Sequence, residues 1–224
     1  MRGKFPRSTH FVVTCSSPIV LEDVVKPAVI GFLKARGLEL SLEKTKIAQI
    51  GQGFNFLGQN VRKYNGKLLI KPSKASVSSI KAIIKETIGN NKSCKTASLI
   101  RLLNPIIRGW CNYHKHIVAK GTFTEIDNYI FNLLWKWAVR RHPNKNRHWV
   151  KNKYFFSKGL RNWVFSAHDG KGKIINLMYA SSVKIVRHVK IISGANPYFS
   201  SWDDYFEKKK TKKLPDIGLQ PGIL

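Results

Sequence analysis

The sequence predicts an α+β fold, with strands toward both ends of the chain and a small helical bundle between them. Three observations lead to this class. Before residue 74, several short runs are rich in β-branched and aromatic residues; from residue 75 to 141 apolar residues recur at helical spacing; after residue 142 turn signals and apolar runs return. We therefore divide the 224 residues into regions 1–74, 75–141 and 142–224.

The first region begins with a predicted buried strand at residues 11–16, where the chain reads F-V-V-T-C-S. A helix follows over residues 21–36, with its apolar residues spaced for one face, and Gly37 stands where a left-handed C-terminal cap is expected. Short strands are predicted at residues 38–40 and 44–47.

A hairpin closes the first region. Residues 53–61 and 67–70 flank Tyr64-Asn65-Gly66, and Asn-Gly between apolar runs is a strong hairpin signal. Lys71-Pro72-Ser73 should end the strands.

The middle region predicts three amphipathic helices, over residues 75–88, 96–118 and 123–141. Pro105 should kink or restart the second helix, because proline lacks a backbone donor. Thr122 and Glu125 have the spacing of a capping box for the third. The residues predicted to face inward are Ile80, Ile83, Ile84, Thr87 and Ile88 in the first helix, Leu99, Leu102, Leu103, Ile106, Trp110 and Tyr113 in the second, and Ile126, Ile130, Leu133, Leu134 and Trp137 in the third.

The last region starts after a break at residues 142–146. Another hairpin is predicted from residues 163–167 and 174–178 about an Asp169-Gly170 turn, with a β-leaning stretch to residue 192. The end of the chain, with K-K-K-T-K-K at residues 208–213, should be an extended basic tail.

The charge of the chain points to a polyanionic partner. It has 40 Lys and Arg against 12 Asp and Glu, a formal net charge of +28, and the basic excess is present in all three regions. A globular chain this basic repels itself unless a polyanion compensates, so a nucleic acid is the favoured partner. No basic amphipathic anchor suggests a membrane surface, and no apolar run approaches the roughly 18 residues of a membrane span. Three widely spaced cysteines argue against a zinc ribbon or a disulfide framework, which favours a cytoplasmic protein.

The most specific motif is L-N-P-I-I-R-G-W-C-N-Y at residues 103–113. It resembles the signature of the group II intron maturase-specific domain, also called domain X, which forms the thumb of intron-encoded reverse transcriptases. G-L-E-L-S-L-E-K-T-K-I at 37–47 and G-F-N-F-L-G at 53–58 resemble the sixth and seventh reverse-transcriptase blocks. The stretch 134–155 resembles the passage from thumb to DNA-binding region, so four blocks occur in the family's order.

The resemblance implies a partial palm of one helix plus antiparallel strands at 1–74, a three-helix thumb at 75–141, and a small basic β-containing DNA-binding-like region at 142–224. In the family a Y-A-D-D turn precedes the strand that 11–16 resembles, and its aspartates hold catalytic Mg²⁺. Here Arg7-Ser8-Thr9-His10 contains no carboxylate, and no H-N-H endonuclease is expected. We therefore predict no catalytic residues, no metal site and no cofactor, and interpret Asp203-Asp204 as a solvated pair.

Two groups of side chains are predicted to bind RNA, because cations contact phosphates and polar groups contact bases or sugars. In the first, Trp110 and Tyr113 are interpreted as core, and Arg108 as either structural or phosphate-binding. The second, with Trp and Tyr residues interleaved, surrounds the break at residue 142. The predicted residues are Arg108, Asn112, His114 and Lys115, followed by Lys136, Arg140, Arg141, Lys145, Arg147, Lys151 and Lys153.

The resemblance implies an RNA-binding protein of maturase type that assists folding and splicing of a group II intron RNA, with target DNA as a further partner. Two alternatives stay open. The chain could be half of a split reverse transcriptase, complemented by a separately encoded fingers–palm fragment, or a non-functional remnant of a mobile element. A general DNA-binding module is a weaker hypothesis.

Overall fold

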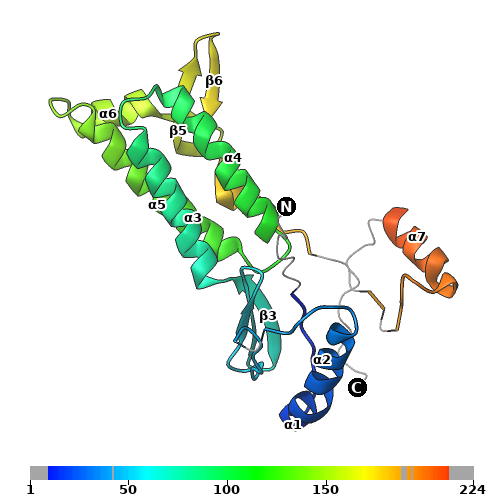
Figure 1. Ribbon diagram of the computed structural model, residues 1–224. Helices are drawn as coiled ribbons and strands as arrows, with labels where there is room; N and C mark the ends of the chain where they lie inside the picture. The colour runs from blue at the N-terminus through cyan, green and yellow to red at the C-terminus, as the bar shows by residue number, and fades with distance from the viewer. Residues whose placement is uncertain (1–9, 42, 188–190, 193, 212–224) are drawn as a thin grey trace, which may run out of the picture. The chain divides into compact units, whose positions relative to one another are not determined.

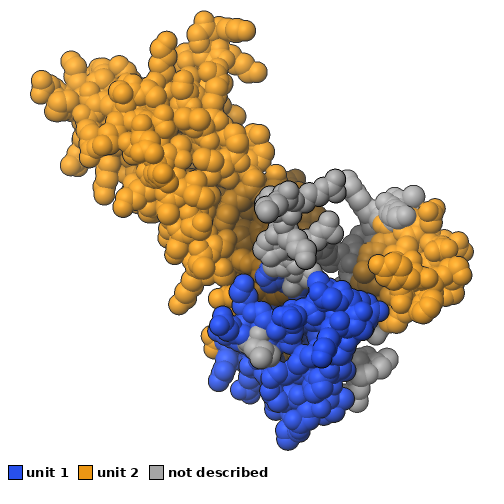
Figure 2. Space-filling model, viewed as in Figure 1, with its two compact units in different colours: residues 1–54 blue, residues 55–224 orange. Residues whose placement is uncertain are grey.

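The computed structural model describes residues 10–41, 43–187, 191–192 and 194–211. The chain forms two compact units, residues 1–54 and 55–224 (Figure 2). Helices and antiparallel strands both occur, so the predicted α+β class is confirmed.

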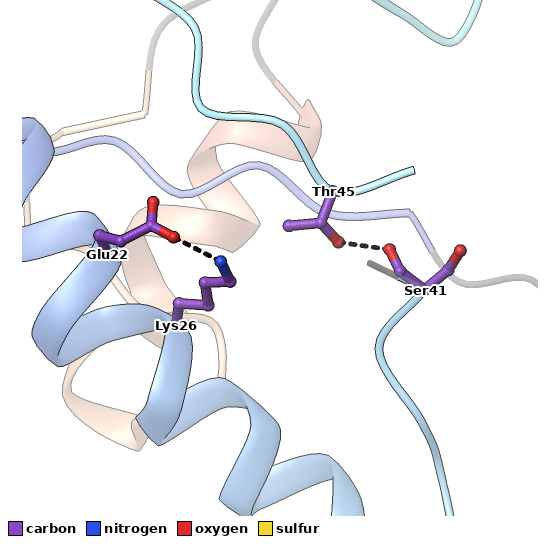
Figure 3. Close-up of polar contacts among 4 residues, drawn as sticks. All are labelled: Glu22, Lys26, Ser41 and Thr45. Carbon is purple, nitrogen blue, oxygen red and sulfur yellow. Dashed lines mark hydrogen bonds and ion pairs between the residues drawn. The ribbon is translucent and has the colours of Figure 1, made fainter. Parts of the chain in front are cut away.

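The described residues of the first unit contain one continuous helical stretch. It comprises α1 (Pro18–Val20), a π-helical turn (Leu21–Val25) and α2 (Lys26–Lys34), close to the predicted helix. Glu22 and Lys26 form an ion pair one turn apart, and the Thr45 hydroxyl donates to the carbonyl oxygen of Ser41 over 2.8 Å (Figure 3).

The helix ends with the left-handed cap at Gly37 that the sequence predicted. Gly37 has φ +68°, and the Leu38 N–H donates to the carbonyl of Leu33 over 3.0 Å. This six-to-one bond is that of a Schellman cap, in which a left-handed glycine reverses the chain.

The strands predicted at 11–16, 38–40 and 44–47 are wrong. None of these segments is a strand, and Phe11, Val12 and Val13 are exposed. A strand needs a neighbour to pair its backbone groups, and the described residues from 10 to 53 offer no other strand.

The predicted hairpin forms within a three-stranded sheet of β1 (Phe54–Phe56), β2 (Gln59–Tyr64) and β3 (Lys67–Pro72). Tyr64 pairs with Lys67, and Asn65 and Gly66 have φ +45° and +82°, as a type I′ turn requires. The strand predicted at 53–61 is interrupted at Leu57-Gly58, with φ +46° and +73°. A left-handed leucine is rare, so the sequence pattern gave no sign of this second turn.

Three long helices follow: α3 (Lys74–Asn90), α4 (Thr96–His114) and α5 (Lys120–Arg140). α3 packs against both α4 and α5 (Figure 1). α4 runs through Pro105 without restarting. The predicted capping box is wrong, because Ala119 is the N-cap of α5 and Glu125 pairs with Lys81 of α3.

The inward face of α4 differs from the prediction. Leu102 and Tyr113 are exposed, as is Ile83 of α3, whereas Ile100, Ile107 and Cys111 are buried. Both faces of this helix carry apolar residues, so periodicity alone could not select the one that packs.

Residues 147–182 of the last region pack onto these helices. The region contains α6 (Arg147–Tyr154), which was not predicted, and a sheet of β4 (Phe155–Lys158), β5 (Arg161–Asp169) and β6 (Lys173–Asn176). β5 and β6 form the predicted hairpin. Figure 1 shows this sheet and the β2–β3 hairpin toward opposite ends of the helices. One buried cluster extends from Ile80 to Ala180, so the chain on either side of residue 142 shares a core.

The predictions for the C-terminal stretch need correction. Residues 177–187 form no strand; a 3₁₀ turn at Ala180–Ser182 is held instead by Asp127, whose carboxylate accepts from the N–H groups of Ala180 (2.7 Å) and Ser181 (2.9 Å). α7 (Asp203–Thr211) replaces part of the predicted extended tail, and residues 212–224 lie outside the described part.

Candidate nucleic-acid interface

A polar stripe runs along α4 on the side away from the core. Arg101, Arg108, Asn112 and Lys115, the half-buried C-cap of the helix, are spaced by seven, four and three residues, which places them on one helical face. Arg101 is paired with Asp169 across 2.8 Å. Arg108 and Asn112 are exposed, and their side chains make no hydrogen bond or ion pair with any described residue. Their polar groups are therefore available to a partner.

Three other members of the 103–113 motif, Asn104, Trp110 and Tyr113, make contacts within the chain. Asn104 donates to the carbonyl oxygen of Asn176 (3.0 Å) and accepts from the Met178 N–H (2.8 Å), which fastens α4 to the end of β6. The Trp110 indole donates to the Ser76 hydroxyl of α3 over 3.1 Å. The Tyr113 hydroxyl donates to the carbonyl oxygen of Leu57 over 2.6 Å. Trp110 is thus half-buried as expected, whereas Tyr113 anchors the β1–β2 turn from an exposed position.

The structure does not support the prediction that His114 binds RNA, because this side chain is buried. Its side chain is 1% exposed, its Nε2 lies 3.1 Å from the Ser76 hydroxyl, and its ring packs 4.6 Å from that of Trp110. Burial, followed by the charge of His116, lowers the pKa of His114 to about 4, so the imidazole is neutral at pH 7. A neutral, covered ring offers RNA neither charge nor surface.

Gly109 lies beside the stripe in the middle of α4. A Cβ added there would meet no atom within 4 Å, so the packing of the described chain does not require glycine at this position. Glycine inside a helix costs about 1 kcal/mol relative to alanine. One use for the missing side chain is to let a partner approach the helix backbone closely.

The second group forms a basic cluster at the C-terminal end of α5 and along α6. Lys136 and Arg140 lie one turn apart on the exposed side of α5, and Lys145 precedes α6. We call the following five exposed residues, none of which forms an ion pair, the α5–α6 cluster: Lys136, Arg140, Lys145, Arg147 and Lys153.

Two predicted residues near this cluster make contacts within the chain. Arg141 donates to the carbonyl oxygens of Lys92 (3.0 Å) and Cys94 (2.8 Å), and its guanidinium lies 4.5 Å from the centre of the Trp137 ring. These contacts hold the α3–α4 connection to α5, so Arg141 has a structural role. Lys151 is half-buried, with its ammonium 5.7 Å from the centre of the Trp163 ring.

Two cations of the cluster lie beside the Trp149 ring. The ammonium groups of Lys145 and Lys153 lie 5.6 Å and 4.7 Å from the centre of its ring. The neighbouring His142 accepts or donates a hydrogen bond with the Tyr154 hydroxyl at 2.8 Å. Burial lowers the pKa of His142, and Lys153, Arg141 and Lys145 lower it further. The cluster is therefore a site of strong positive potential.

The described residues contain no group of three His, Cys, Asp or Glu side chains that could hold a metal ion. Asp203 and Asp204 lie in the first turn of α7. Among the helices described, none combines the length and apolar character needed to cross a membrane.

Sequence reasoning missed three exposed residues near the cluster, Phe131, Arg161 and Trp163. Arg161 and Trp163 are two residues apart in β5 and therefore share one face, which the period of a strand could have shown. That this face is partly open to solvent could not be read from the sequence, because α6, which borders it, was not predicted.

Two comparisons with known proteins bear on this surface. Residues 77–155 match the model of the group II intron maturase-specific domain. Over 189 residues the chain is 26% identical to the ribosomal operon-associated A protein of Euglena longa, covering 82% of this chain and 36% of that protein. The chain thus spans about a third of the length of this curated relative. The domain match shows that residues 77–155 are similar to a group II intron maturase-specific domain.

Proposed function

We propose that this chain binds a group II intron RNA directly and stabilises the fold in which that RNA is spliced. The observation that carries the proposal is the position of the exposed polar groups: Arg108 and Asn112 of α4 and the α5–α6 cluster all lie within residues 77–155, the stretch that matches the maturase-specific domain. Cations without carboxylate partners are suited to phosphate contacts, which supply affinity and set orientation on the RNA.

We further propose that α3, α4 and α5 correspond to a reverse-transcriptase thumb and that residues 1–74 correspond to part of a palm. The three-helix packing and the β2–β3 hairpin support this assignment. The chain has no polymerase activity of its own under this proposal, because Arg7-Ser8-Thr9-His10 lacks the carboxylates that would position two Mg²⁺ ions. Target DNA stays a proposed second partner.

A competition titration tests the proposed function. The full chain is titrated against the group II intron RNA nearest to its reading frame, at several salt concentrations and with excess tRNA. We expect intron RNA binding to survive the competitor, because shape recognition adds to the phosphate contacts. Equal binding of both RNAs with a steep salt dependence would reveal only a general polycation and would overturn the proposal.

The substitution Gly109→Ala tests whether RNA meets this face of α4. The added methyl group has open space within the chain and improves helix propensity, so the free energy of unfolding should rise by about 0.5–1 kcal/mol. Affinity for the intron RNA should fall at the same time, because the methyl group prevents close approach. Denaturant unfolding and the titration above measure the two effects. A variant that gains stability and keeps full affinity would show that the RNA lies elsewhere.

A further inference from the structure

An aromatic cluster joins α5 to the β4–β5 hairpin. We call Phe131 and Trp135 of α5, Phe155 of β4 and Trp163 of β5 the aromatic ledge. The Trp163 ring lies 6.0 Å from Phe131, 5.9 Å from Trp135 and 5.8 Å from Phe155, centre to centre. Phe155 is buried, but Phe131 is 37% and Trp163 45% exposed. The ledge is therefore anchored in the core while two of its rings reach solvent.

Cations border the exposed rings. The ammonium of Lys151 lies 5.7 Å from the centre of the Trp163 ring, and the guanidinium of Arg161 lies 4.3 Å from that of Tyr179. The Tyr179 hydroxyl donates to the Trp163 carbonyl oxygen over 2.8 Å, which ties the Arg161 pair to the ledge. Asp127, whose charge acts on Tyr179, already accepts from two backbone N–H groups. The surface thus presents aromatic faces beside positive charge.

The space beside these rings limits what can bind. The hollow lined by Phe131, Phe155, Trp163 and Tyr179 has a volume of about 20 Å³. That is room for about one water molecule, far less than a base needs. A ligand must therefore lie on the exposed rings.

We propose that Phe131 and Trp163 are a stacking platform for unpaired bases of RNA, with Lys151 and Arg161 contacting the adjacent phosphates. Base stacking on aromatic rings tolerates any sequence, and nearby cations hold the backbone, so the combination selects single strands. The proposal rests on RNA binding by this chain and names the part of the RNA that the ledge contacts: an unpaired segment, in contrast to the duplex phosphates available to the α5–α6 cluster.

The test uses the full chain and two labelled RNAs of unrelated sequence, a single-stranded 12-mer and a blunt duplex. We expect the double variant Phe131→Leu with Trp163→Leu to lose about fivefold or more in affinity for the single strand, the lower range for loss of one stacked base. Duplex affinity should change by less than about twofold, since the cations remain. The single variant Trp163→Phe should keep most of the affinity for the single strand that the double variant loses, because it has an aromatic ring at this position.

Each outcome decides the proposal. If the double variant lost equal affinity for both RNAs, or none for the single strand, the stacking platform would be overturned. In the second case the aromatic ledge would have to bind something other than unpaired bases. Circular dichroism shows whether the double variant folds. If it does not, the single variant Trp163→Phe is compared with the unsubstituted chain, since both carry an aromatic ring at this position. The two proposals can fail separately. If tRNA displaces the intron RNA in the competition titration but the double variant still has lower affinity for the single strand, the proposed maturase function fails and the stacking platform stands.

Discussion

Replacing the α5–α6 cluster by glutamine should weaken intron RNA binding on the order of a hundredfold at physiological salt, the largest effect on binding that we expect. The variant carries Lys136→Gln, Arg140→Gln, Lys145→Gln, Arg147→Gln and Lys153→Gln. Because these exposed cations have no carboxylate partner, their removal costs the fold little. The slope of log affinity against log salt should fall in magnitude by about one per phosphate contact removed, or about five. A titration series between low and physiological salt measures both quantities.

A matched control separates this surface from charge in general. The control removes five other exposed lysines, so its net charge equals that of the cluster variant. Because these lysines lie outside the proposed interface, we expect the control to lose much less affinity. Equal losses would mean that RNA binds the net charge of +28 without a defined site. The control positions are Lys34, Lys44, Lys63, Lys85 and Lys184.

Short sequence signals correctly predicted the turns, caps and helices whose backbone conformation depends on neighbouring residues in the chain. Asn65-Gly66 gave the hairpin, Gly37 gave the cap, and apolar periodicity gave the three long helices. The strand at residues 11–16 failed for a different reason. Its composition suits a strand, but strand formation depends on a partner elsewhere, and composition carries no information about that partner.

The candidate site shows the same division. Residue type identified a basic, polar set around α4, α5 and α6, which the structure places largely on exposed faces. Type could not separate Arg141 and His114 from the rest. A guanidinium that binds two carbonyls and an imidazole that is 1% exposed look like RNA ligands until their neighbours are known. Those neighbours, Lys92, Cys94 and Ser76, lie on other elements, so only the tertiary fold could reveal them.

The 103–113 motif contains two asparagines that the structure assigns to opposite roles, and their substitution should show it. Asn104→Ala removes two hydrogen bonds and leaves the Asn176 carbonyl and the Met178 N–H without their partner in a half-buried place. Leaving such groups unpaired costs about 1–3 kcal/mol each, so we expect the free energy of unfolding to fall by about 2–4 kcal/mol. Denaturant unfolding followed by circular dichroism measures this change.

Asn112→Ala is the matched control, because Asn112 lies on the same helix with no partner among the described residues. Its unfolding free energy should stay within about 0.5 kcal/mol of the unsubstituted chain. Intron RNA affinity should behave in reverse: lowered by Asn112→Ala, and unchanged by Asn104→Ala when measured well below its unfolding transition. If Asn104→Ala proved as stable as Asn112→Ala, the attachment of α4 to β6 would not depend on this side chain. The link between the helix that carries the polar stripe and the sheet that carries Trp163 would then rest on other residues.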